Sequence, residues 1–184
     1  PADAGTALSE HGFAFLFAPM YHPAFKNIMP ARKLCAEAGQ RTLFNFLGPL
    51  LNPARPTAQL IGVPSAELTE PMAKVLQNLG IRRGMVVSGS AGEKRMDELS
   101  TLGENAIAEF YQDRGFASST LNPADLQLEK ATLEDLRGGD APTNAGIIRS
   151  ILVGETKGPK REAVLLNAGA ALFVANKAEA ISTG

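Results

Sequence analysis

Short apolar runs alternate with a helical period in the middle of the chain. Residues 59–63 and 85–87 have the length and composition of core strands. Between them, Ser65 is suited to N-cap a helix that we expect to run to about residue 79, where Gly80 ends it. The apolar face predicted for this helix consists of Leu68, Met72, Val75, Leu76 and Leu79. A strand, a helix and a strand in this order predict a crossover connection between two parallel strands.

Helices and loops are predicted before this unit. Residues 13–17 form an apolar run that suits a buried strand or a strand–loop junction. We expect a helix over residues 24–38, ended by Gly39, with a kink or a break where Pro30 interrupts it. Residues 41–56 predict a short helical segment followed by an irregular loop. The residues that break regular structure there are Gly48-Pro49 and Asn52-Pro53.

More strands and helices are predicted in the second half of the chain. Residues 106–112 and 116–121 read as strands that can pair with each other. A connector over residues 133–139 leads to helices over residues 142–152 and 161–176. These elements predict the α/β class, with a central, mostly parallel sheet flanked by helices. We expect residues 1–184 to form a single α/β domain.

The composition narrows the classes of function. The chain has 184 residues, of which 45% are hydrophobic, and a net charge of −1 with scattered Lys and Arg, which disfavours a general nucleic-acid binder. No apolar run approaches the ~20 residues of a membrane span, so we expect no membrane association. Cys35 is the only cysteine, which excludes an intrachain disulfide and suits a reducing cytoplasm. It lies in an apparent helix and is interpreted as a small buried hydrophobic residue rather than a nucleophile.

Asp97 and Glu98 stand side by side after the predicted strand 85–87 and a segment of small residues. Mg²⁺ takes one or two carboxylates, several waters and substrate phosphates as ligands, and adjacent acids beyond the end of a core strand suit it. Acidic pairs are also common in solvated turns. The residues alone therefore leave two interpretations, a solvated turn or part of a magnesium site.

Three other segments could carry chemistry. His22 and Phe25 lie at the start of the predicted helix and Arg32 follows within it, so an Arg fork could bind a carboxylate. An exposed helix with ordinary charges explains the same residues. Gly48 and Pro49 could let the backbone form a wall beside a flat ring, or form a plain buried turn. The third segment, Gly138-Gly139-Asp140, could offer amides to a phosphate but better suits a loop end before a helix, which an acid stabilises.

Five segments in this order resemble one enzyme family much more specifically. They are PMYHPAFKNIMPARK, RTLFNFLGPLLNPARPTAQLIGV, MDELSTLGEN, LRGGDAPTNAGIIRSILVGE and VLLNAGAALFVA. The chain resembles the anthranilate phosphoribosyltransferase family of tryptophan biosynthesis over essentially all 184 residues. The resemblance implies the large α/β domain of the nucleoside phosphorylase and phosphoribosyltransferase type. It also implies a cytoplasmic enzyme that transfers the phosphoribosyl group of phosphoribosyl pyrophosphate to anthranilate.

The resemblance also implies roles for particular residues. Asp97 and Glu98 would hold Mg²⁺. Arg32 would bind the anthranilate carboxylate. The anthranilate channel would be lined by His22, Phe25, Gly48 and Pro49. No catalytic residue that reacts covalently is implied.

The chain departs from the family pattern in several ways. The family's GTGGD loop, its KHGN-type segment and its helical N-terminal domain are absent, so we expect a fragment that is inactive alone. The parent protein would form a homodimer through that helical domain. The spacing between Arg32 and Arg41 is about three residues longer than is usual in the family, and Ser88 stands where many members have His.

Two alternatives stay open at this point. One is a relative of the pyrimidine-nucleoside phosphorylases, which the FNFLGPLLNP block and Arg32 disfavour. The other is a non-catalytic paralogue that binds nucleic acid, which the net charge of −1 disfavours.

Overall fold

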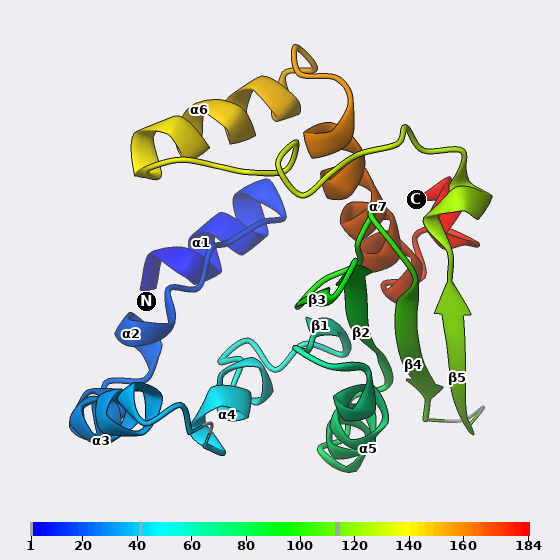
Figure 1. Cartoon of the computed structure of the whole chain (residues 1–184). Helices are drawn as coiled ribbons and strands as arrows, with labels where there is room; N and C mark the ends of the chain where they lie inside the picture. Colours follow the sequence, from blue (N-terminus) through cyan, green and yellow to red (C-terminus); the bar gives the residue numbers. More distant parts are fainter. Residues whose placement is uncertain (1, 41, 113–114) are drawn as a thin grey trace. The chain divides into compact units, whose positions relative to one another are not determined.

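The chain divides into two compact units, Pro1–Arg55 and Pro56–Gly184. The computed structural model describes residues 2–40, 42–112 and 115–184, and Figure 1 shows their elements along the chain. The expectation that residues 1–184 form one α/β domain stays a prediction.

The first unit is helical. Its helices are α1 (Ala2–His11), α2 (Ala18–Tyr21), α3 (Phe25–Glu37) and α4 (Phe44–Leu50). None of its described residues is fully buried. Gly39, with φ +68°, follows α3 and confirms the predicted helix end.

One prediction for the first unit is wrong and another is wrong in part. Residues 13–17 form no strand, and the side chains of Phe13 and Phe15 are 71% and 77% exposed, because no described strand pairs with this segment. At Pro30 we expected a kink or a break, and the break does not occur, since the helix continues through Pro30. In α4, Gly48 and Pro49 lie within the last turn, and the irregular segment begins only after Leu50.

The second unit is built on a sheet with the strand order β1-β2-β4-β5 and β3 paired to β2. The strands are β1 (Ala58–Gly62), β2 (Arg83–Ala91), β3 (Lys94–Met96), β4 (Asn105–Tyr111) and β5 (Gly115–Leu121). A 3-10 turn, η1 (Ala66–Leu68), and helix α5 (Thr69–Asn78) connect β1 to β2. β1 and β2 are parallel, with Leu60 opposite Met85, which confirms the predicted crossover.

The α/β class and the central sheet flanked by helices are confirmed, but the sheet is not mostly parallel among the described residues. Only β1 and β2 pair in parallel, whereas β2–β3, β2–β4 and β4–β5 are antiparallel. The reason lies in the connections. A parallel pair needs a long crossover, and among the described residues α5 is the only α-helix between consecutive strands of this sheet.

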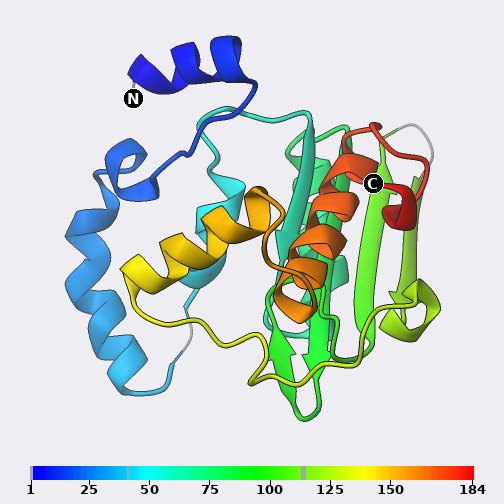
Figure 2. The same cartoon turned by 90° about the horizontal axis from the view of Figure 1, so that it is seen from above.

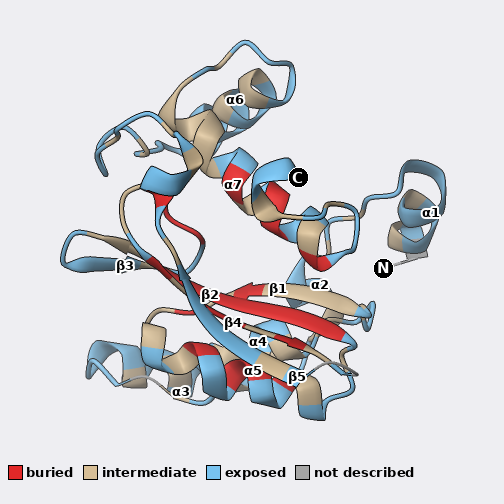
Figure 3. Ribbon diagram, turned by 90° about the vertical axis from the view of Figure 1, so that its right-hand side faces the viewer, coloured by how far each residue is buried: buried red, intermediate tan, exposed pale blue. Residues whose placement is uncertain are grey.

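Helices cover both faces of the sheet. Helix α7 (Pro159–Val174) lies over one face, as Figure 2 shows, and α5 lies on the other, as the burial colouring in Figure 3 makes clear. The α7 side of the core consists of Met85, Val87, Leu99, Ile107, Leu166, Ala170 and Val174. The buried centre of β2 between the two helices explains why residues 85–87 are apolar without alternation.

The predicted apolar face of α5 is only partly correct. Met72 and Leu76 are buried, but the side chains of Val75 and Leu79 are 41% and 59% exposed. Ala73 is fully buried in their place. The buried face of α5 therefore consists of Thr69, Met72, Ala73 and Leu76, and the helix is preceded by the 3-10 turn η1.

Helices α6 (Ala141–Leu152) and α7 agree with the helices predicted over residues 142–152 and 161–176. Two 3-10 turns, η2 (Pro123–Leu126) and η3 (Ile181–Thr183), were not predicted. Gly154, with φ +80°, follows α6 and marks its end. In the part of the chain that the structure describes, no helix combines the length and the apolar character that crossing a membrane requires.

Candidate functional site

Asp97 and Glu98 follow a hairpin and not, as the sequence suggests, a loop that leaves the core strand. Strand β2 continues to Ala91, Gly92 turns the chain with φ +65°, and β3 returns antiparallel to β2. Both acidic residues are exposed in the bend after β3. The hairpin accounts for the long stretch between the predicted strand and the acidic pair.

The backbone of the acidic pair lies against the ends of two strands. Gly62 is the last residue of β1, and a Cβ atom placed on it would lie 1.5 Å from the carbonyl oxygen of Asp97. A Cβ atom on Gly89, near the end of β2, would lie 2.6 Å from the carbonyl oxygen of Glu98. Glycine is therefore required at both positions for this approach. The pair thus stands at the carboxyl ends of the two parallel strands, where open α/β sheets bind ligands.

Buried residues anchor the chain immediately after the pair. The Leu99 side chain is in the core and only 1% exposed. The Ser100 amide donates to Asn105 Oδ1 at 2.6 Å, and Asn105 Nδ2 donates to the Ser100 carbonyl at 3.0 Å. The Ser100 hydroxyl donates to the carbonyl of Ser90 in β2 at 2.7 Å. Two exposed carboxylates therefore project from a backbone whose next residues are fixed in the core.

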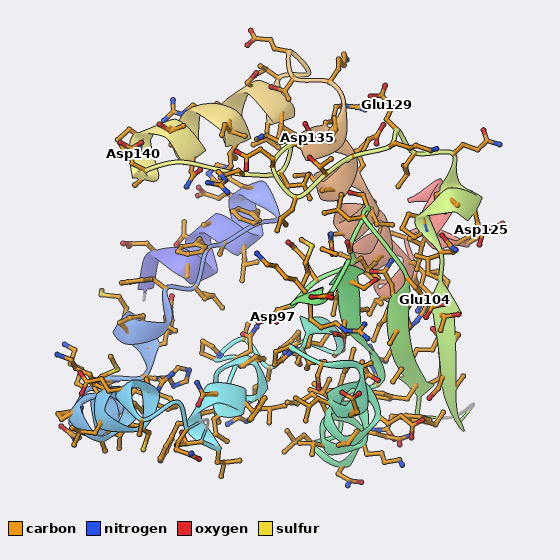
Figure 4. The ribbon with its side chains drawn as sticks, in the orientation of Figure 1. Asp97, Glu104, Asp125, Glu129, Asp135 and Asp140 are labelled. Atoms are coloured by element: carbon orange, nitrogen blue, oxygen red, sulfur yellow. The ribbon has the colours of Figure 1, made fainter. Side chains whose placement is uncertain are left out.

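The chemistry of this pair fits Mg²⁺. Among the described residues, neither the Asp97 nor the Glu98 carboxylate forms a hydrogen bond or an ion pair within the protein. No group of three His, Cys, Asp or Glu side chains in the described ranges could hold a metal by itself. Figure 4 shows the same dispersion, with labelled acids spread over separate elements. Two exposed carboxylates match an ion that completes its shell with water and substrate phosphates.

Other acids are committed to local hydrogen bonds. Bonds from its own backbone amide and from Ser65 lower the pKa of Glu67, with a smaller contribution from Arg95. The Thr143 hydroxyl and amide hold the pKa of Asp140 below its ordinary value. The Thr143 amide donates to Asp140 Oδ1 at 3.0 Å, so Asp140 is the N-cap of α6. This confirms the structural interpretation of the Gly138-Gly139-Asp140 segment.

The residues predicted to line the anthranilate channel lie in the first unit and include an aromatic cluster. The rings of His22 and Phe25 meet edge to face, with centroids 5.8 Å apart. Phe25 meets Phe44 of α4 in the same manner at 6.5 Å. The His22 carbonyl accepts the amide of Phe25 at 3.0 Å, so the turn between α2 and α3 fixes the two rings relative to each other. His22 and Phe25 are both half-buried.

Arg32 lies two turns after Phe25 on the same face of α3. Its side chain is half-buried, and its guanidinium forms no ion pair with any described residue. Gly48 has open space where a Cβ atom would stand, and Pro49 lies beside it in α4. Arg41, the other end of the longer spacing, lies outside the described residues.

The structure thus groups the predicted residues into two sets. His22 and Phe25 are in contact, and Arg32 shares their helix face, while Asp97 and Glu98 are adjacent in the second unit. The two sets belong to different compact units, and each stands on its own geometry. Cys35 is half-buried in α3 and unpaired, and the fully buried Ser88 hydroxyl in β2 has no hydrogen-bond partner in the described part of the chain.

Sequence reasoning missed the residues that support the acidic pair. Gly62, Gly89 and Asn105 shape and anchor it through backbone contacts. A weak signal existed, because Gly62 lies within one apolar run and Gly89 follows another, where glycine marks close backbone approach. Nothing in the sequence pattern pairs Asn105 with Ser100.

Comparisons with known proteins agree with these segments. Residues 1–184 match the family described as "Glycosyl transferase family, a/b domain". The chain is 47% identical over 177 residues to the anthranilate phosphoribosyltransferase of Clostridium beijerinckii, covering 96% of this chain and 50% of that protein. It is 46% identical over 184 residues to the enzyme of Lacticaseibacillus casei, covering 100% of this chain and 52% of that protein.

Solved structures give the same relationship. The crystal structure of anthranilate phosphoribosyltransferase from Thermus thermophilus matches with a TM-score of 0.83 and 45% identity, covering 97% of this chain and 50% of that one. A variant of the Saccharomyces cerevisiae enzyme with Mg bound matches with a TM-score of 0.78 and 25% identity, covering 95% and 49%. The chain therefore spans about half the length of the relatives it matches. It belongs to the glycosyl transferase family, a/b domain.

Proposed function

We propose that the whole protein containing this chain transfers the phosphoribosyl group from phosphoribosyl pyrophosphate to anthranilate. The products are N-(5-phosphoribosyl)anthranilate and pyrophosphate, in tryptophan biosynthesis. The observation that carries the proposal is the exposed pair Asp97 and Glu98, anchored at the carboxyl ends of two parallel strands. The 47% identity to an anthranilate phosphoribosyltransferase over 96% of the chain supports the choice of acceptor.

The proposed reaction is a substitution at the ribose. The amine nitrogen of anthranilate forms a bond to C1 of the ribose, the bond from C1 to the pyrophosphate oxygen breaks, and the amine loses one proton. Mg²⁺, when bound, neutralises the negative charge that develops on the departing pyrophosphate. The protein's main contribution is to hold both substrates in a reactive orientation.

Each candidate residue has a role in this proposal. Asp97 and Glu98 supply carboxylate oxygens to Mg²⁺. Arg32 binds the anthranilate carboxylate with its planar fork of N–H donors. The rings of His22 and Phe25 form a wall for the flat substrate, and the Gly48-Pro49 backbone of α4 lines the same channel.

The proposal extends to the setting of the enzyme. The whole protein is cytoplasmic, forms a homodimer through a helical domain and binds no nucleic acid, in line with a net charge of −1 in this chain. The isolated 184 residues are inactive. Sedimentation of the whole protein beside the isolated chain tests the dimer, and an assay of both tests the inactivity.

The experiment that tests the function follows the loss of anthranilate fluorescence with phosphoribosyl pyrophosphate and Mg²⁺. Arg32→Ala raises the KM for anthranilate by about tenfold or more, because a charged hydrogen-bond pair is lost. Arg149→Ala, at an exposed position in α6, is the matched control and leaves KM unchanged. The variant Asp97→Ala/Glu98→Ala loses the dependence of rate on Mg²⁺.

A different result would redirect the proposal. A whole protein that is inert with anthranilate but cleaves pyrimidine nucleosides with phosphate would be a nucleoside phosphorylase. A protein inert in both assays that shifts nucleic acid in a gel, with strong salt dependence, would be a binding paralogue.

A further inference from the structure

Helix α7 carries one polar side chain within its apolar stretch. Asn167 stands in the segment Leu166–Val174, where Leu166, Ala170 and Val174 are buried. It is half-buried and lies one residue after a core position. A polar amide in such a place needs hydrogen-bond partners, since an unsatisfied one would be costly.

Both ends of the Asn167 amide bind the backbone of Leu99. The Leu99 amide donates to Asn167 Oδ1 at 3.0 Å, and Asn167 Nδ2 donates to the Leu99 carbonyl at 2.9 Å. Asn167 Nδ2 also donates to the carbonyl of Ala163, one turn earlier in α7, at 3.0 Å. The side chain is therefore held by its own helix while it holds a segment 68 residues away.

The residue that Asn167 binds is the one next to the acidic pair. Leu99 directly follows Glu98, and its side chain is 1% exposed beneath the bend. Because one amide fixes both the N–H and the C=O of Leu99, it replaces the strand partner that this segment lacks. Any shift of α7 along the sheet would move the backbone from which Glu98 projects.

The bend that carries the acidic pair is held from different sides by different residues. Gly62 and Gly89 limit the bend from the side of the strands, and Asn105 holds Ser100. Asn167 is the only side chain among the described residues that hydrogen-bonds to the backbone between Asp97 and Leu99. It acts through Leu99 and lies on a different element from the carboxylates.

We propose that Asn167 is a positioning residue for the Asp97 and Glu98 carboxylates. Through its bonds to Leu99, helix α7 affects how tightly this pair binds a divalent cation. The inference rests on the proposed role of this pair in binding Mg²⁺. Residues that orient metal ligands without touching the metal commonly change its affinity by about 10–100-fold.

The chain contains a matched control for the same kind of contact. Asn144 in α6 accepts the Gly139 amide at 2.9 Å and donates to the Gly139 carbonyl at 2.9 Å. This amide therefore makes the same two-point contact with a backbone residue before a helix. The neighbouring carboxylate of Asp140 caps α6 and holds no proposed metal.

The test compares Asn167→Ala with Asn144→Ala in the whole protein. Mn²⁺ alone is titrated and its free form is measured by electron paramagnetic resonance, with urea unfolding of each variant recorded in parallel. Asn167→Ala is expected to weaken Mn²⁺ binding by about tenfold or more. It also raises the Mg²⁺ concentration for half-maximal rate by a similar factor, while KM for anthranilate stays unchanged. Asn144→Ala leaves Mn²⁺ binding unchanged even where its stability falls.

The outcomes separate this inference from the proposed function. If Asp97→Asn and Glu98→Gln remove Mn²⁺ binding while folded Asn167→Ala binds as tightly as the unmodified protein, Asn167 is a structural tether and the inference is wrong. If the ligand variants bind Mn²⁺ as the unmodified protein does, the proposed metal site itself fails and the inference fails with it. Should Asn167→Ala not fold, Asn167→Ser, which keeps a polar group, is measured against the same control.

Discussion

At the scale of single residues, the candidate metal site depends on two glycines beside it. Gly62 and Gly89 have no Cβ, and this absence lets the carbonyls of Asp97 and Glu98 approach the strands. By residue type alone, Asp97 and Glu98 do not differ from any other solvent-exposed pair of acidic residues. What distinguishes them is the backbone on which they stand, fixed by Leu99 in the core.

Gly62→Ala tests this argument. The added Cβ would meet the backbone carbonyl of Asp97 at 1.5 Å, and backbone cannot give way as a flexible side chain can. We expect a loss of about 1–3 kcal/mol in the free energy of unfolding, measured in urea, with weaker Mn²⁺ binding. Gly146→Ala in α6, where a Cβ meets nothing within 4 Å, should be neutral or stabilise by about 0.5–1 kcal/mol. Equal stabilities of the two variants would contradict the close approach.

At the scale of elements, hairpins and caps decide where the candidate residues stand. Strand β3 pairs antiparallel with the end of β2. Asp97, which follows β3, therefore lies at the carboxyl ends of the parallel strands. In the same way, Asp140 begins α6 by accepting the amide of Thr143. Local polar residues thus determine which acidic side chains form hydrogen bonds within the protein and which stay available for a ligand.

The cap of α6 predicts a dependence of stability on pH. Because hydrogen bonds from Thr143 lower the folded-state pKa of Asp140, its contribution is complete above the ordinary value of 3.8 and is lost as pH falls through the lower folded value. Asp140→Asn keeps a capping oxygen that does not titrate. The difference in free energy of unfolding between the two proteins should be constant between about pH 5 and 7 and should change below that range. Asp140→Ala should be less stable than both at neutral pH; a difference that stays flat into acid would rule out this role.

At the scale of the whole molecule, the buried core belongs to one unit. All residues of the hydrophobic core, from Ile61 to Val174, lie in Pro56–Gly184, and no described residue of the first unit is fully buried. Burial of apolar surface is the main stabilising contribution in folding. Burial of this core therefore stabilises the second unit.

Residues 56–184 alone should fold cooperatively. Thermal unfolding followed by circular dichroism should give one transition, with a midpoint close to that of the major transition of the 184-residue chain. Residues 1–55 alone should show no cooperative transition, because none of their described residues is fully buried. A 56–184 chain without a cooperative transition would show that the first unit contributes to the core.

The sequence by itself determined the local elements and the family. Apolar runs of strand length, a helical period between 59–63 and 85–87, and the order of five motifs were enough for the crossover, the α/β class and the candidate residues. The sequence prediction was wrong at residues 13–17, an apolar run that forms no strand, and only partly correct for the buried face of α5. Local pattern holds no information on partners that are distant in sequence.

Only the tertiary structure decided how the acidic pair is held. The contacts of Gly62 with Asp97 and of Asn167 with Leu99 join residues 35 and 68 positions apart. The antiparallel majority of the sheet likewise follows from which strands meet, and no single strand's composition encodes it. The sequence specifies the type of each side chain. The position of a carboxylate depends on backbone contacts that form only when the strands and α7 pack together.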